Sequence, residues 1–89
     1  MTSRNPPAIL GEAVLLISFA HRDALTAQLA AYGCRVTAAR RMAGIEKRFA
    51  SSGAAVVIVD LRDAREEGLA AIACLAPIID AQGGALIAI

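Results

Sequence analysis

Two short runs of apolar residues constrain the fold of this chain most strongly. Residues 13–17 read AVLLI and residues 56–59 read VVIV, with no polar side chain in either run. A run this short that is apolar at every position is typical of a strand buried on both faces. Strands of that kind occur in parallel sheets that carry helices on both sides, and the segments between the runs must then supply those helices.

The intervening segments have helical periodicity. Apolar residues recur at helical spacing in residues 21–33, 40–53 and 66–84, and each of these segments ends at a glycine. Residues 34–39 and 85–89 read as two further strands. The order βαβαβαβ predicts an α/β fold with right-handed crossovers. Pro77 lies inside the third helical segment and predicts a kink or a break there, because proline removes a backbone hydrogen bond.

The length of 89 residues allows one small domain, which we place at residues 12–89 behind a flexible leader at residues 1–11. The net charge of +1 gives no reason to expect nucleic acid or an anionic membrane as a partner. The leader does not read as a signal peptide, and the two cysteines lack the spacing of a metal or redox motif. We therefore expect a cytoplasmic protein.

In open α/β sheets, ligands bind beyond the carboxyl ends of the strands. The residues after the first strand, SFAHRD, lack the glycines of a dinucleotide site, and no phosphate-binding GxxxxGK motif occurs in the chain. Asp60 follows the VVIV strand, where a carboxylate can bind a cation or attack a phosphoryl group. The alternative is that Asp60 and Asp63 only cap the loop and the next helix. His21 is interpreted as a surface or capping residue, with a phosphate carrier or proton shuttle near the crevice as the alternative.

The stretch VVIVDLRDAREEGL, residues 56–69, resembles the phospho-acceptor segment of response-regulator receiver domains. In that family an apolar strand ends in the acceptor aspartate, and an acidic residue followed by glycine comes seven to eight residues later. The resemblance places Asp60 on the acceptor position and Glu67-Gly68 on the acidic-Gly pair. It implies a flavodoxin-like sheet with the strand order 2-1-3-4, incomplete because the fifth strand is missing.

The chain departs from the receiver pattern at the metal site. Receivers carry two acidic residues after the first strand, whereas Ser18 and Phe19 stand here. With Asp63 and Glu67 they are the expected neighbours of Asp60 in the crevice. Asp60 alone is at most a weak Mg²⁺ ligand, so we expect no catalytic residue, no firmly bound metal and no cofactor. The chain also reaches Ile89 before the family's switch residue and lysine, and we expect the natural protein to continue.

The resemblance implies a degenerate receiver that regulates a two-component or cyclic-di-GMP signalling protein. The alanine-rich residues 66–89 are similar to segments that precede diguanylate cyclase (GGDEF-type) domains, although this segment itself is not expected to be an enzyme. A histidine kinase is a possible partner. A homodimer through the exposed sheet edge or the helices is also expected. The alternatives are a working receiver that is phosphorylated on Asp60 and the N-terminal half of an α/β enzyme.

Overall fold

A computed structural model describes residues 12–39, 43–62 and 64–89. The expected leader, residues 1–11, lies outside the described residues, and so does Asp63. Seven elements alternate along the chain: β1 (Ala13–Ile17), α1 (Arg22–Ala31), β2 (Arg35–Ala39), α2 (Ile45–Ser52), β3 (Val56–Val59), α3 (Arg65–Ala81) and β4 (Ala85–Ala88). No helix in these ranges has the length and apolar character needed to cross a membrane.

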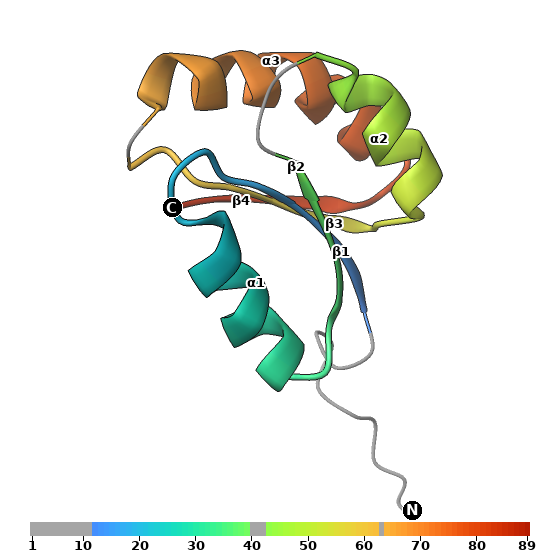
Figure 1. Ribbon diagram of the computed structural model, residues 1–89. Coiled ribbons are helices and arrows are strands. Elements are labelled where there is room, and N and C mark those ends of the chain that lie inside the picture. The colour runs from blue at the N-terminus through green and yellow to red at the C-terminus, as the bar shows by residue number, and fades with distance from the viewer. Residues whose placement is uncertain (1–11, 40–42, 63) are drawn as a thin grey trace, which may run out of the picture.

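The four strands form one parallel sheet in the order β2-β1-β3-β4, which confirms the predicted fold class. β1 lies in the middle, with Val14 opposite Val36 of β2 and opposite Val56 of β3. The order agrees with four of the strands of a flavodoxin-like sheet. In Figure 1, α1 lies on one face of the sheet, while α2 and α3 lie together on the other.

The core has two parts because alternate residues of a buried strand point to opposite faces. Leu15 and Ile17 of β1 point toward α2 and α3, where they pack with Phe49 and Leu75 in the larger cluster. Val14 and Leu16 of β1 point toward α1, with Cys34 and Ile58, in the smaller one. All five residues of β1 are buried, whereas α1 has no fully buried residue. The sheet is thus covered more thoroughly on the side of α2 and α3.

Two details differ from the sequence-based expectations. α3 runs unbroken from Arg65 to Ala81 through Pro77, so of the two outcomes expected at Pro77 the break into two helices is wrong, and the kink stays a prediction. Pro77 lies on the exposed side of the helix, where water can bond the carbonyl left without an amide partner. α2 begins only at Ile45, because Gly44 adopts a left-handed conformation (φ 74°) at the N-cap and does not belong to the helix.

Candidate functional site

Asp60 is fixed in the sheet by its backbone and buried by its neighbours. It directly follows β3, and its amide donates a hydrogen bond to the carbonyl of Ile17 at the end of β1 (2.9 Å). The next amide, of Leu61, donates to the carbonyl of Ile89 beyond β4 (2.7 Å). Only 2% of the surface of Asp60 is exposed. The carboxylate therefore sits where the carboxyl ends of three parallel strands meet.

Four hydrogen bonds reach the two oxygens of the Asp60 carboxylate. Oδ1 accepts from the backbone amide of Arg62 (3.0 Å) and from Nε of the same residue (2.9 Å). Oδ2 accepts from Nη2 of Arg62 (3.1 Å) and from the hydroxyl of Ser18 (3.0 Å). An ionised carboxylate offers about four lone-pair positions. The acceptor capacity of Asp60 is thus filled by groups of the same chain.

This arrangement keeps the carboxylate charged although it is buried. The hydrogen bond from the Arg62 side chain is the main cause that holds the pKa of Asp60 well below its usual range. Burial acts in the opposite direction, and the hydrogen bonds from the Arg62 amide and Ser18 add to the lowering. Charge-assisted bidentate pairs of this kind are stronger than neutral hydrogen bonds. Asp60 is therefore an anion with its counter-ion already in place.

Ser18 connects Asp60 to the start of α1. Its side chain is fully buried, and its hydroxyl oxygen accepts a hydrogen bond from the amide of His21 (3.1 Å) while donating to Asp60. The imidazole of His21 lies close by, with Nδ1 3.4 Å from Oδ2 of Asp60 and 41% of the side chain exposed. His21 stands at the N-cap position of α1, where its side chain makes no capping hydrogen bond.

The other expected neighbours of Asp60 have different roles. Phe19 is half-buried and packs on the core under α2 and α3, so it offers no polar group to the site. Glu67 is exposed in the first turn of α3, where a negative charge suits the helix dipole. Asp63 lies outside the described residues. The structure therefore brings Ser18 into hydrogen-bond contact with Asp60. Among the contacts of the described residues, none joins a polar group of Phe19 or Glu67 to Asp60.

Gly68 has a packing role that explains why a glycine follows Asp60 at this distance. It is buried in the first turns of α3, which lie against the end of β3. A Cβ at this position would overlap with Cδ2 of Leu61 and would lie 3.4 Å from Cγ1 of Val59. The glycine lets the helix approach the strand end closely. Gly68 thus serves the packing of α3 against the end of β3 in this structure.

The described residues do not fit a magnesium ion at this site. Mg²⁺ needs oxygen ligands with available lone pairs, usually from one or two carboxylates. Asp60 has its lone pairs occupied by four hydrogen bonds, and Ser18 supplies one neutral oxygen that is also engaged. Within residues 12–39, 43–62 and 64–89, no group of three His, Cys, Asp or Glu side chains is placed to hold a metal ion.

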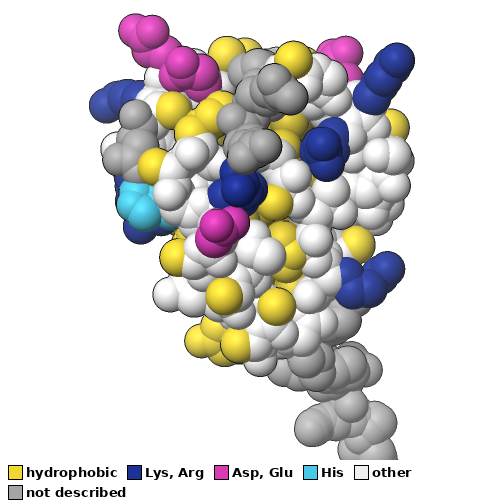
Figure 2. Space-filling view, in the orientation of Figure 1, with side chains coloured by type: hydrophobic (Ala, Val, Ile, Leu, Met, Phe, Trp, Pro, Cys, Tyr) yellow, Lys and Arg dark blue, Asp and Glu magenta, His cyan; other side chains and the backbone are white. Residues whose placement is uncertain are grey.

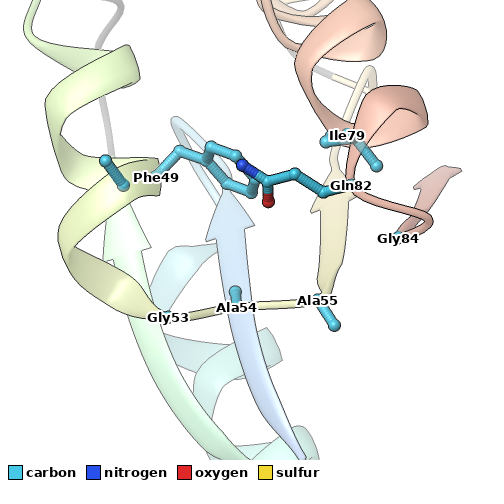
Figure 3. A pocket seen from close by; sticks show the side chains of 8 residues that line it. Phe49, Gly53, Ala54, Ala55, Ile79, Gln82 and Gly84 are labelled. Atoms are coloured by element: carbon cyan, nitrogen blue, oxygen red, sulfur yellow. The ribbon is translucent and has the colours of Figure 1, made fainter.

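A separate pocket of about 320 Å³ lies at the opposite end of β3, between the C-terminal ends of α2 and α3. Figure 3 shows the ring of Phe49 and the amide of Gln82 turned toward each other across it, above the small residues Ala54 and Ala55. The side chain of Gln82 is the only polar one in the lining, which contains no titratable group. The lining of this pocket can give a ligand apolar contacts and one side-chain amide, but it contains no acid, base or nucleophile.

Arg62 is the residue of the site to which the sequence interpretation gave no role. The signal that could have found it is its spacing: an arginine two residues beyond a strand-end aspartate can reach back with both its amide and its guanidinium. Comparisons of the chain with protein-family models, with curated proteins and with solved structures found no significant match. The function must therefore be argued from the site.

Proposed function

We propose that this chain is a receiver-like regulatory module that performs no chemistry, in which Arg62 takes the place that a metal ion would need at Asp60. The observation that carries the proposal is the complete satisfaction of the Asp60 carboxylate by Arg62 and Ser18. A carboxylate attacks phosphorus with a lone pair, and here each lone pair already accepts a hydrogen bond. The cluster thus holds the strand ends in one fixed arrangement.

The location of Asp60 supports the comparison with receivers in particular. It follows the third strand of a 2-1-3-4 parallel sheet and lies beside the first residue after β1. The proposed role is regulation within a two-component or cyclic-di-GMP signalling protein, in the cytoplasm, with a diguanylate cyclase as one output that the resemblance suggests. A histidine kinase would then be a partner only if Arg62 were displaced.

A magnesium and beryllofluoride titration tests this proposal. Beryllofluoride mimics an aspartyl phosphate and binds only where the acceptor carboxylate and a divalent ion are both available. We expect the amide NMR signals of residues 60–62 in the ¹⁵N-labelled chain to stay unchanged when millimolar Mg²⁺ and beryllofluoride are added. Clear shifts of these signals would overturn the proposal and establish a working receiver instead.

Two variants make this test sharper. Arg62→Ala removes both side-chain donors from the carboxylate, and we expect Mg²⁺-dependent shifts to appear in this variant. Arg65→Ala is the matched control, because it removes an exposed arginine three positions along the chain and should leave the titration silent. If Arg62→Ala also fails to respond, the guanidinium is not what closes the site, and the proposal loses its main support.

A further inference from the structure

The pocket of about 320 Å³ at the N-terminal end of β3 is lined by two glycines that the backbone requires. Gly53 adopts a left-handed conformation (φ 67°), which a residue with a Cβ rarely takes. A Cβ on Gly84 would lie 2.6 Å from the carbonyl oxygen of Ala55, so the two backbone segments are too close for a larger residue. Neither position can therefore carry a side chain that fills the hollow.

The lining of this pocket comes from the interior of the sequence. Within the described part of the chain, its residues all lie between Phe49 and Gly84, on α2, on α3 and on the segments that lead into β3 and β4. Phe49 and Ile79 also belong to the larger core cluster, so the pocket reaches down to the core. A volume of about 320 Å³ lies at the lower end of the range for sites that take small organic molecules.

Two helices end at this pocket with their C-termini and give it a negative field. Figure 3 shows α2 leading to Gly53 and α3 leading to Gly84 on either side of the pocket. The aligned peptide dipoles of a helix place about half a negative charge at its C-terminus. Neither helix has a basic side chain in its last turn to offset this charge, and α3 carries the exposed Asp80 there. The two helix ends and this carboxylate act in the same direction.

This negative field is local to the pocket. The chain has a net charge of +1, so its overall charge does not attract a cation. Figure 2 shows basic and acidic side chains mixed on one face of the molecule, with no broad field of one sign. A preference for a positively charged ligand must therefore come from the groups at the pocket itself.

We propose that this pocket binds a small organic ammonium ion, with its charged group between Phe49 and Gln82 and its apolar part over the alanine residues below them. The aromatic ring of Phe49 attracts a cation through its quadrupole. Gln82 has the only polar side chain in the lining, and its carbonyl oxygen can accept a hydrogen bond from an ammonium N–H. The two helix ends disfavour an anion at the same place. The inference does not rest on the regulatory role proposed for Asp60.

Titration with three probes of similar size tests the preference for a cation. Phenethylammonium, phenethyl alcohol and phenylacetate share a phenyl ring and carry a positive charge, no charge and a negative charge at neutral pH. In the ¹⁵N-labelled chain we expect millimolar phenethylammonium to shift the backbone signals of Gly53 and Gly84 and the side-chain amide signals of Gln82. It should bind about three- to tenfold more tightly than the alcohol, because both helix ends favour the charge, and phenylacetate should bind most weakly.

Two variants at Ala50 separate the effect of charge from that of bulk. Ala50 lines the pocket from the last turn of α2 and is exposed, so a longer side chain there leaves the core intact. Ala50→Lys places a fixed cation at this helix end, and we expect the preference for phenethylammonium over the alcohol to disappear. Ala50→Gln has a side chain of similar reach without the charge and should keep the preference.

The same titrations can overturn the proposal. It fails if phenethylammonium leaves the signals of Gly53, Gly84 and Gln82 unmoved in the parent chain, or if the alcohol or phenylacetate binds as tightly. It also fails if the preference is lost in both Ala50 variants or kept in both, because the negative field at the helix ends is then not its cause.

Discussion

Arg62 binds both oxygens of Asp60 with its side chain, Nε to Oδ1 at 2.9 Å and Nη2 to Oδ2 at 3.1 Å. The two residues are only two positions apart in the sequence, so the loop directly after β3 brings the guanidinium back to the carboxylate. The carboxylate is 2% exposed, whereas 49% of the arginine side chain remains exposed. The buried acid therefore depends on a cation that solvent can reach.

Removing the cation should destabilise the fold. In Arg62→Ala the Asp60 carboxylate stays buried but loses two charge-assisted hydrogen bonds, and we expect the free energy of unfolding to fall by about 1–2 kcal/mol. Urea unfolding at pH 7 measures this change. Arg65→Ala should stay within about 0.5 kcal/mol of the parent, as surface substitutions usually do. Equal losses in the two variants would contradict a specific role for Arg62.

Stability should decrease in acid through Asp60. Because the pKa of Asp60 is lower in the folded state than in the unfolded state, its contribution is complete at pH values above the unfolded pKa of about 3.9. It is lost progressively as the pH falls from there toward the folded pKa. Urea unfolding between pH 6 and 2 should show this decline, and Asp60→Asn should show less of it. An unchanged pH profile in Asp60→Asn would disprove the assignment.

Ser18 should contribute more to the free energy of unfolding than a side chain of its size usually does. Ser18→Ala leaves the His21 amide without its acceptor and removes one of the two donors to Oδ2 of Asp60, at a position where both Ser18 and Asp60 are buried. We expect a loss of about 1–3 kcal/mol in unfolding free energy. Ser51→Ala serves as the control, because the Ser51 hydroxyl donates only to the Arg48 carbonyl on an exposed surface. A loss in Ser18→Ala no larger than in Ser51→Ala would count against the buried network.

A carboxylate at position 18, combined with the removal of Arg62, should create a metal site. The double variant Ser18→Asp, Arg62→Ala places two carboxylates together and removes the competing cation. We expect it to be less stable than the parent without metal, because two like charges are then buried, and to be stabilised by millimolar Mg²⁺. Thermal unfolding with and without Mg²⁺ measures this, with the parent chain as the control. No gain in melting temperature would show that the crevice cannot hold the ion.

Gly84 should tolerate a methyl group less well than Gly68. A Cβ at Gly84 would lie 2.6 Å from the carbonyl oxygen of Ala55, which belongs to the backbone and cannot move aside. We expect Gly84→Ala to lower the unfolding free energy by about 1–3 kcal/mol. At Gly68 the closest atom is the end of the Leu61 side chain, which can rotate, and helix propensity offsets part of the cost. Urea unfolding of both variants should show this order, and the reverse order would contradict it.

The fold followed from the sequence because the strands have a strong signal. AVLLI and VVIV are apolar at every position, which is what a strand in the middle of a parallel sheet requires, and they became the central β1 and β3. The position of Asp60 at a strand end followed from the same reading. The boundaries of the elements were harder to predict. Gly44 lies inside a helical sequence pattern, yet its left-handed backbone conformation places it before the helix, at the N-cap of α2.

The partners of Asp60 were harder to predict, since periodicity says nothing about where loop side chains point. Arg62 and His21 both follow strand ends, and only the folded chain shows that the guanidinium turns back to the carboxylate while the imidazole lies beside it. The same limit applied to Gly68, which a family resemblance linked to a phosphorylation motif. The structure adds that a side chain at this position would meet Leu61 and Val59.

The central position of β1 has a consequence for synthesis on the ribosome. β1 is synthesised before β2 and β3 and pairs with both, so the second neighbour of Val14 exists only after Val56 has been made. Until then a wholly apolar strand has one side without a partner, which invites aggregation of the nascent chain. Slower translation or a chaperone that shields AVLLI should therefore raise the yield of native protein more than changes to α1 would.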